Sequence, residues 1–269
     1  MTRRLFVVGN NNRRRPNSLI WLGENRLFGK ISLKDVTPTS LEDARRLLND
    51  CVLFRKLAPT ERNELVARAH MRKFEAGETI FLTGALNSSM MAVLKGEVKI
   101  SITSAEGKEI MLAIVHEGEV FGEIAMLDGK PRSADASALT ACELAVVDRR
   151  DMLAALERNP AAWPGLVEVL CSRMRRTDQH LVELALLELP ARLAKALLRI
   201  VDAERPRATN LARTECHLSQ SELATIVGAA RESVNKCLHA WQRTGMIQMK
   251  RRTINIADRA ALEALAELE

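Results

Sequence analysis

The segment from Phe121 to Ser133 contains the residue types needed to hold one small anionic ligand. Arg132 carries a planar guanidinium whose N–H donors suit two oxygens of a phosphate, and Ser133 adds a hydroxyl donor. Gly122 allows a close approach of the backbone. Residues 124–127 are long enough for about one helical turn, whose free N–H groups would face an anion. The segment therefore predicts an anion-binding loop.

Glu123 is the exception in this segment, because a carboxylate repels phosphate. Beside Arg132 it serves the same ligand only if it accepts a hydrogen bond from another group, such as a sugar hydroxyl. The alternative is that Glu123 and Arg132 form an ordinary surface ion pair on a turn. The residues alone favour neither interpretation.

Two short runs, Phe121-Gly122-Glu123-Ile124-Ala125 and Pro131-Arg132-Ser133-Ala134, resemble the phosphate-binding cassette of cyclic-nucleotide-binding domains. The resemblance implies that Glu123 accepts a hydrogen bond from the ribose 2′-OH and that Arg132 binds the cyclic phosphate. It favours a ligand site over a surface ion pair. The cassette residues implied to bind ligand are Gly122, Glu123, Ile124, Ala125, Arg132 and Ser133.

Length and composition restrict the kind of protein. A chain of 269 residues favours two domains over one. No apolar run approaches the roughly 18 residues of a membrane span, and residues 5–8 are too short for a secretory signal, so a cytoplasmic location is expected. The five cysteines lie far apart without a C-x-x-C pair, which gives little support to a zinc site or an iron–sulfur cluster. The net charge of +6 permits an acidic polymer as a partner.

The N-terminal half has the pattern of a β-roll with flanking helices. Residues 1–40 are basic at first and lack periodicity, so a mostly disordered leader is expected. Helices are predicted over 40–57 and from Pro59 onward. Short apolar or alternating runs, separated by glycines, follow at 79–81, 90–94, 98–102, 110–115 and 138–147. Strands of this length with turn signals every 11 or 12 residues indicate an antiparallel barrel or jelly roll, assigned here to residues 41–158.

A helical period replaces the strand pattern after Asp148. A short helix is predicted over 149–158 and a long one from Pro160, which makes 159–188 a candidate dimerisation helix. Its apolar seam recurs at spacings of 3 and 4: Val167, Leu170, Met174, Thr177, Leu181 and Leu184. Such a seam is typical of a coiled coil and predicts a homodimer about a two-fold axis. The alternative is a helix packed on its own roll.

Thr177 is the one polar member of this seam. It could fix the register of a coiled coil or face a ligand buried under the helix. The stretch from Leu184 to Arg192 resembles the end of the dimer helix in bacterial cAMP receptor proteins. That resemblance implies that Thr177 contacts an adenine ring and that residue 178 reaches the ligand of the partner subunit. Asp178 stands where this family usually has serine.

The residues after a break at Glu188-Leu189-Pro190 have the pattern of a winged helix-turn-helix, assigned to 189–269. Ser219 and Glu222 form a capping box for one helix, Gly228 lies in a tight turn, and a second helix begins at Arg231. Residues 246–256 predict a two-stranded wing with a basic tip.

Charge supports DNA as the partner of this second domain. Residues 205–252 contain nine Lys or Arg against three Asp or Glu. Val234, Leu238 and Trp241 form the expected buried stripe of the recognition helix. Ala230 occupies its N-cap position without a capping side chain, which predicts a frayed start. The residues expected to contact DNA are Ser219, Gln220, Arg231, Glu232, Ser233, Asn235, Lys236, Lys250 and Arg251.

Residues 41–260 as a whole resemble the cAMP receptor protein branch of the Crp/Fnr transcription regulators, an α+β fold. The resemblance implies an allosteric cyclic nucleotide, namely cAMP, and neither a cofactor nor a metal. It also implies a homodimer on a palindromic double-stranded DNA operator, with RNA polymerase as a further partner and no membrane. The ligand would favour one arrangement of the hinge between the domains, because it binds that arrangement more tightly than the others.

Two other functions remain open. One is a regulator of the same fold that senses another signal, such as a redox change or haem, or nothing. The other is an enzyme that uses the Arg132 pocket for a phosphorylated substrate. The five histidines are scattered, and none stands beside a nucleophile or a metal partner, so no enzyme is expected.

Overall fold

The computed structural model describes Phe54 and residues 57–203, 215–250 and 253–267. The leader predicted over 1–40 lies outside the described residues, as does the helix predicted over 40–57 apart from Phe54 and Leu57.

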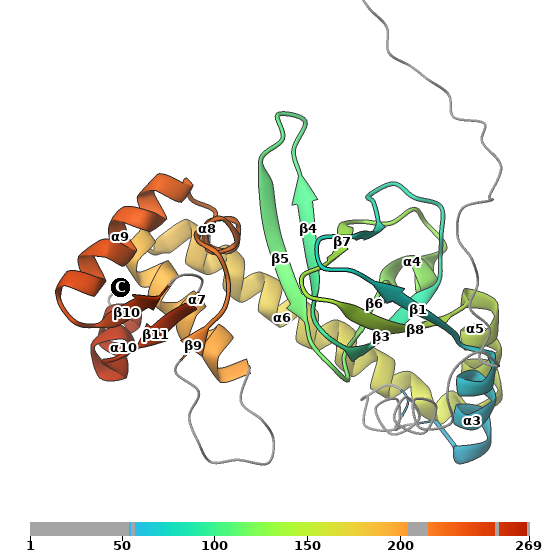
Figure 1. Cartoon of the computed structure of the whole chain (residues 1–269). Helices are drawn as coiled ribbons and strands as arrows, with labels where there is room; N and C mark the ends of the chain where they lie inside the picture. Colours follow the sequence, from blue (N-terminus) through green and yellow to red (C-terminus); the bar gives the residue numbers. More distant parts are fainter. Residues whose placement is uncertain (1–53, 55–56, 204–214, 251–252, 268–269) are drawn as a thin grey trace, which may run out of the picture. The chain divides into compact units, whose positions relative to one another are not determined.

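The N-terminal part is a roll of two antiparallel four-stranded sheets (Figure 1). One sheet has the strand order β1-β8-β3-β6 and the other β2-β7-β4-β5. The strands are β1 His70–Phe74, β2 Thr79–Phe81, β3 Met90–Lys95, β4 Val98–Thr103, β5 Glu109–Val115, β6 Val120–Phe121, β7 Asp135–Ala138 and β8 Cys142–Val147. The jelly-roll prediction is thus confirmed in its antiparallel pairing.

The core of the roll lies between its two sheets. In β3 every residue from Met90 to Leu94 is buried, so both faces of this strand are covered, and it pairs with β8 through Met91 opposite Val146. Val98 and Leu144 are completely buried in the same apolar cluster as Phe121. This cluster fixes β6, the strand that leads directly into the predicted anion-binding loop.

The loop contains a short helix, α4, over Glu123–Asp128. Gly122 precedes it with φ +78°, a left-handed conformation that side chains other than glycine rarely adopt. The helix starts one residue earlier than the sequence indicated. Glu123 therefore lies in the first turn, next to the free N–H groups of the helix.

Helices cover one end of the roll and extend from it. They are α3 Pro59–Arg68, α5 Arg149–Arg158, the 3-10 turn η2 Pro160–Ala162 and α6 Trp163–Leu186. Leu166 of α6 packs into the apolar cluster that α3 and α5 cover. A neighbouring face of α6 remains exposed, with Val167 52%, Met174 67% and Leu181 64% accessible, and Trp163 at its start is 39% accessible. None of the described helices has the length and apolar character needed to span a membrane.

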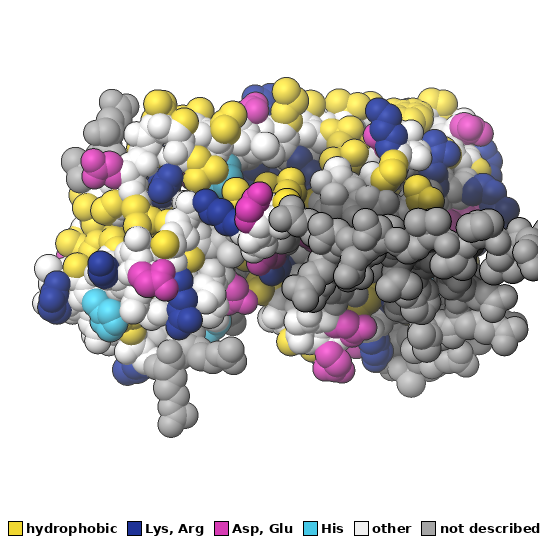
Figure 2. All heavy atoms as spheres, turned by 90° about the horizontal axis from the view of Figure 1, so that it is seen from above, with side chains coloured by type: hydrophobic (Ala, Val, Ile, Leu, Met, Phe, Trp, Pro, Cys, Tyr) yellow, Lys and Arg dark blue, Asp and Glu magenta, His cyan; other side chains and the backbone are white. Residues whose placement is uncertain are grey.

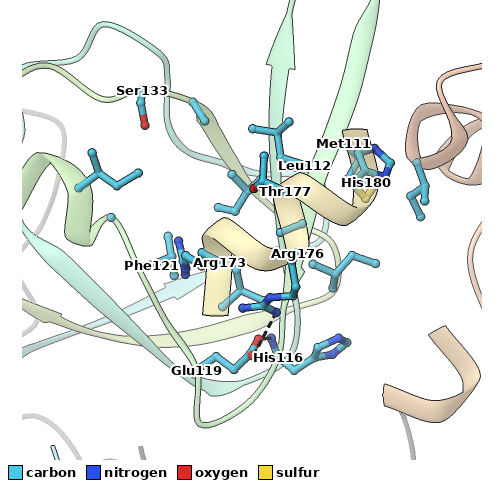
Figure 3. A pocket seen from close by; sticks show the side chains of 18 of the residues that line it. Met111, Leu112, His116, Glu119, Phe121, Ser133, Arg173, Arg176, Thr177 and His180 are labelled. Carbon is cyan, nitrogen blue, oxygen red and sulfur yellow. Dashed lines mark hydrogen bonds and ion pairs between the residues drawn. The ribbon is translucent and has the colours of Figure 1, made fainter. Parts of the chain in front are cut away.

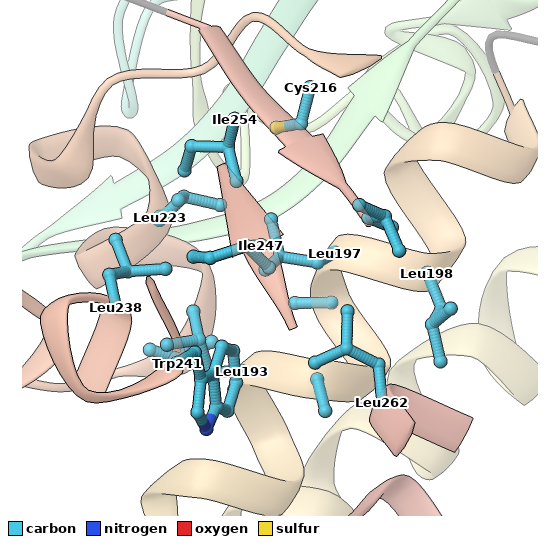
Figure 4. Packing of buried hydrophobic residues seen from close by; sticks show 14 of the residues in the cluster. Leu193, Leu197, Leu198, Cys216, Leu223, Leu238, Trp241, Ile247, Ile254 and Leu262 are labelled. Carbon is cyan, nitrogen blue, oxygen red and sulfur yellow. The ribbon is translucent and has the colours of Figure 1, made fainter. Parts of the chain in front are cut away.

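The C-terminal part is a winged helix-turn-helix. Its elements are α7 Leu189–Ala203, β9 Glu215–Cys216, α8 Gln220–Val227, α9 Arg231–Arg243, β10 Ile247–Lys250, β11 Thr253–Ile256 and α10 Arg259–Glu267. Leu197, Leu238 and Ile247 pack together with the indole of Trp241 (Figure 4). The sheet order is β10-β11-β9.

Several local predictions for this part are confirmed. Ser219 caps α8 by accepting a hydrogen bond from the Glu222 N–H, and Glu222 accepts one from the Ser219 N–H in return. Gly228 ends that helix in the left-handed conformation. Ala230 precedes α9 with φ −69° and ψ 141° and provides no side-chain cap. Pro190 is the second residue of α7, so the break after α6 is also the start of a new helix.

Candidate ligand site and nucleic-acid interface

A cavity lies in the roll against α6, where residues of the cassette, of β4 and β5 and of α6 line it. Thr177 lines it from α6 and faces the same space as Leu112 of β5 (Figure 3). Asp178 is exposed and is not among the residues that line this cavity. All the predicted cassette residues line it: Gly122, Glu123, Ile124, Ala125, Arg132 and Ser133.

Arg132 is held in a fixed position at this cavity, with only 3% of its surface exposed. Its Nη1 donates to the Gly122 carbonyl oxygen at 3.0 Å and its Nη2 to the Ser89 carbonyl oxygen at 2.7 Å. The guanidinium carbon lies 4.1 Å from the centre of the Phe81 ring, a cation–π contact. Burial lowers the pKa of Arg132 to about 10, while the charge of Glu123 opposes this shift, so the guanidinium stays protonated at neutral pH.

Gly122 is required for space as well as for conformation. A Cβ on this residue would lie 2.4 Å from Arg132 Nη1 and 3.1 Å from the Ser89 carbonyl oxygen. The close approach lets the Gly122 carbonyl oxygen accept directly from the guanidinium. Any larger residue would displace the side chain that is predicted to bind phosphate.

Glu123 is completely buried, and neither of its carboxylate oxygens has a hydrogen-bond partner among the described residues. Arg173 Nη1 lies 3.0 Å from Glu123 Oε1, an ion-pair distance without hydrogen-bond geometry. A buried polar group without a hydrogen bond costs about 1–3 kcal/mol, and more when the group is charged. A hydroxyl group of a ligand in this cavity would satisfy the carboxylate.

Arg173 is a residue of this site that the sequence did not reveal. It also donates a hydrogen bond to the Val120 carbonyl oxygen, so it ties α6 to both the cassette and β6. Arg176 of the same helix reaches Glu119 at 3.7 Å (Figure 3). The available signal was spacing, because Arg173 precedes Thr177 by one helical turn and therefore shares its face.

The rest of the cavity wall is largely apolar. Phe81, Ile100, Met111 and Leu112 line it from strands of one sheet. An apolar wall next to an anion site suits a ligand with a charged phosphate and an apolar base. The cavity thus contains the separate polar and apolar regions that a nucleotide requires.

The exposed start of α9 is the candidate DNA-reading surface. Arg231, Glu232, Ser233 and Lys236 are exposed, whereas Val234, Leu238 and Trp241 are buried as predicted. The prediction that Asn235 lies on the outer face is wrong. It is half-buried, and its Oδ1 is buried without a hydrogen-bond partner among the described residues. Asn235 follows Val234 and precedes Leu238 by one turn, which places it beside the buried stripe.

The other predicted DNA contacts lie around this helix. Ser219 uses its hydroxyl oxygen as the cap of α8 and is half-buried, as is Gln220. Lys250 is exposed at the end of β10, and Arg251 lies outside the described residues. On the face shown in Figure 2, Lys and Arg side chains alternate with Asp and Glu and with apolar groups.

The cysteines do not form a reactive or metal-binding cluster in the part of the chain that the structure describes. Cys142 and Cys216 are buried, and Cys237 is half-buried in α9. Burial raises the pKa of Cys142 and raises that of Cys237 to about 11, which disfavours the thiolate. Cys171 is exposed on α6, and Cys51 lies outside the described residues.

The fold and the two surfaces define a ligand-binding transcription regulator, and comparison with known proteins gives its family. A model of the cyclic nucleotide-binding domain matches residues 71–159, and a model of the Crp-like helix-turn-helix domain matches residues 191–265. A cyclic AMP receptor protein from Thermus thermophilus is 34% identical over 214 residues, 80% of this chain and 96% of that protein. The chain belongs to the Crp/Fnr family of transcription regulators and contains both its cyclic nucleotide-binding and its DNA-binding domain.

Further relatives agree with this assignment. A CRP-like cAMP-activated global transcriptional regulator from Mycobacterium tuberculosis is 29% identical over 206 residues, 77% of this chain and 92% of that protein. A solved CRP-family regulator from Thermus thermophilus is 30% identical with a TM-score of 0.59, covering 72% of this chain and 96% of that one. A crp/fnr family regulator from Eubacterium rectale has a TM-score of 0.67 over 82% of this chain and 100% of its own; at 18% identity it supports the fold alone.

Proposed function

We propose that this protein is a homodimeric regulator that binds cAMP in the roll and then a palindromic DNA operator. The observation that carries the proposal is the pair formed by Arg132 and Glu123. Arg132 is a buried cation beside the cavity, and Glu123 is a buried carboxylate whose oxygens lack hydrogen bonds among the described residues. A 3′,5′-cyclic nucleotide has both complements, a phosphate and a single free ribose hydroxyl, at the two ends of one ring system.

The choice of cAMP is supported by the names of the relatives and by Thr177. The Thermus thermophilus relative is a cyclic AMP receptor protein, and the one from Mycobacterium tuberculosis is described as cAMP-activated. Thr177 offers a hydroxyl to the base from the cavity wall. Asp178, one residue later and exposed, would reach the ligand of the partner subunit in the proposed dimer. RNA polymerase is the proposed partner of the DNA-bound dimer.

Binding should depend on Arg132. In Arg132→Leu the cyclic phosphate would face only neutral donors, and the charge-assisted hydrogen bonds would be lost. Calorimetric titration of the wild type should show binding of cAMP, with cGMP titrated in parallel, and Arg132→Leu should show none. Circular dichroism should confirm that the variant is folded.

Two results would contradict the proposal. Equal affinity in Arg132→Leu and the wild type would exclude the cassette as the phosphate site. Hydrolysis of cyclic nucleotide during prolonged incubation would indicate an enzyme instead of a regulator.

A further inference from the structure

The orientation of Arg132 is set by a short segment between β2 and β3 that contains Asn87 and Ser89. Arg132 Nη2 donates to the Ser89 carbonyl oxygen at 2.7 Å and lies 3.2 Å from the Ser89 hydroxyl oxygen and 3.4 Å from Asn87 Oδ1. Ser89 is itself only 4% exposed. Nη2 of the guanidinium is thus surrounded by neutral hydrogen-bond acceptors.

Asn87 fixes the conformation of this segment. Its Oδ1 accepts hydrogen bonds from the Ser89 N–H at 2.9 Å and from the Ser89 hydroxyl at 2.8 Å. A side-chain oxygen that accepts from the N–H two residues later forms an Asx turn, which organises a loop locally. Two backbone hydrogen bonds join the same loop to Arg132: the Gly84 N–H donates to the Arg132 carbonyl oxygen and the Arg132 N–H to that of Ala85.

The arrangement keeps the charge of Arg132 available while restricting its motion. The acceptors from Asn87, Ser89 and Gly122 are neutral, so none of them cancels the positive charge as a carboxylate would. The Nε–H, in contrast, has no hydrogen-bond partner among the described residues. A long flexible side chain loses rotamer freedom when it binds a ligand, and prior fixation avoids part of that cost.

We propose that the Asn87–Ser89 turn is a positioning element that presents Arg132 to the ligand phosphate in one orientation. It would thereby determine which of the two non-bridging phosphate oxygens is bound more strongly. This inference rests on the proposed function, because it deepens the role of the same site. Asn87 and Ser89 act through Arg132 and need not touch the ligand.

The test compares the two phosphorothioate isomers of cAMP, in which sulfur replaces one non-bridging oxygen or the other. The full-length wild type should bind one isomer more tightly than the other by calorimetry. Ser89→Ala should weaken cAMP binding roughly three- to tenfold, as expected for loss of one hydrogen bond. It should also reduce the preference between the isomers, because the guanidinium loses one of the contacts that fix its orientation.

Matched variants separate positioning from a general structural role. Ser89→Thr retains the hydroxyl and should restore both the affinity and the isomer preference. Ser88→Ala removes a neighbouring serine that makes none of these contacts with Arg132 and should behave as the wild type. The penalty for removing the ribose 2′-OH, which concerns Glu123, should be the same in all of these variants.

Asn87→Asp provides a second and independent variant. It keeps the acceptor oxygen, and therefore the turn, but places a negative charge within hydrogen-bonding distance of Arg132 Nη2. Its cAMP affinity should fall by more than that of Ser89→Ala, because the new carboxylate competes with the phosphate.

The outcomes distinguish this inference from the proposed function. If the wild type binds cAMP but Ser89→Ala and Asn87→Asp keep its affinity and its isomer ratio, only the positioning role is overturned. If the wild type binds no cyclic nucleotide, the proposed function fails, and this inference fails with it.

Discussion

Glu123 shows at the scale of one residue how burial reveals a binding site. In the sequence it is an acidic residue next to an anion-binding loop, and an exposed ion pair with Arg132 would have explained it. In the structure it is completely buried without hydrogen bonds among the described residues. A surface ion pair is not buried in this way, and the ion pair that Glu123 forms with Arg173 leaves both carboxylate oxygens without a hydrogen bond, so a ligand hydroxyl fits here as a donor.

The contribution of Glu123 can be measured with a ligand that lacks the 2′-OH. We expect 2′-deoxy-cAMP to bind the wild type more weakly than cAMP by roughly 1.5 to 3 kcal/mol, the value typical of a hydrogen bond to a charged group. In Glu123→Gln this difference should shrink, because the amide accepts a weaker bond. Calorimetry with both ligands and both proteins gives the four affinities from which the two differences are compared. Equal differences in the two proteins would mean that Glu123 only supports the fold.

The residues of the ligand site differ in how readily the sequence revealed them. Glu123 and Arg132 could be predicted because they lie in one contiguous segment with a recognisable spacing. Arg173 could not, because it is brought to Glu123 only by the packing of α6 on the roll. Asn87 and Ser89 could not either, because a polar turn between two strands is common in sequence and its contact with Arg132 is long-range.

At the scale of one element, α9 begins without a cap. Ala230 already has the extended conformation of an N-cap residue, so a serine there would not need to move. We expect Ala230→Ser to raise the free energy of unfolding by about 1 kcal/mol, measured by urea denaturation. Ser219→Ala at the capped helix α8 should lower it by a similar amount. If the Ala230→Ser variant is no more stable than the wild type, the free N–H groups at the start of α9 have other hydrogen-bond partners.

The exposed face of α9 should read bases, while the wing should contact the DNA backbone. An arginine can donate to guanine O6 and N7 together. Arg231→Ala should therefore weaken the free energy of binding to the operator by roughly 1 to 3 kcal/mol and change binding to random DNA little. Lys250→Ala should weaken binding to the operator and to random DNA alike, and it should reduce the dependence of the affinity on salt concentration. Fluorescence anisotropy at several salt concentrations measures both effects. Equal losses on operator and random DNA in Arg231→Ala would identify a phosphate contact.

Strands with a regular hydrophobic pattern were predicted well. Strands whose conformation depends on pairing with a distant strand were not. The runs at β3, β4 and β5 are apolar or alternate regularly, and each strand lies within a residue of its predicted bounds. His70–Phe74 contains only two apolar residues and was missed, because its strand conformation depends on pairing with β8. β9 is two residues long and depends on β11 in the same way.

At the scale of the whole molecule, the exposed apolar residues of α6 suit the proposed homodimer. Val167, Met174 and Leu181 are more than half exposed at coiled-coil spacing, which in solution would leave a continuous apolar stripe. In the proposed homodimer a second copy of the chain would cover such a stripe symmetrically. The two recognition helices of this dimer would meet half-sites about one helical turn apart.

Met174→Glu tests this assembly. Two carboxylates would face each other across the two-fold axis, so the variant should be monomeric in analytical ultracentrifugation at concentrations where the wild type is a dimer. Its affinity for the two-half-site operator should fall to that for a single half-site. Arg175→Glu, at the next position of the same helix, changes the net charge by more than Met174→Glu does. This control variant should remain dimeric. A dimeric Met174→Glu protein would require another interface.

The distribution of tryptophan gives this protein its own optical reporters. The chain contains no tyrosine and three tryptophans, of which Trp21 lies outside the described residues. Trp163 stands half-exposed at the start of α6, and Trp241 is buried in the core of the winged helix. The two described indoles therefore lie in different surroundings, one near the predicted dimer seam and one within the DNA-binding domain. In a Trp21→Phe variant, the emission spectrum of an unlabelled sample would report on both regions.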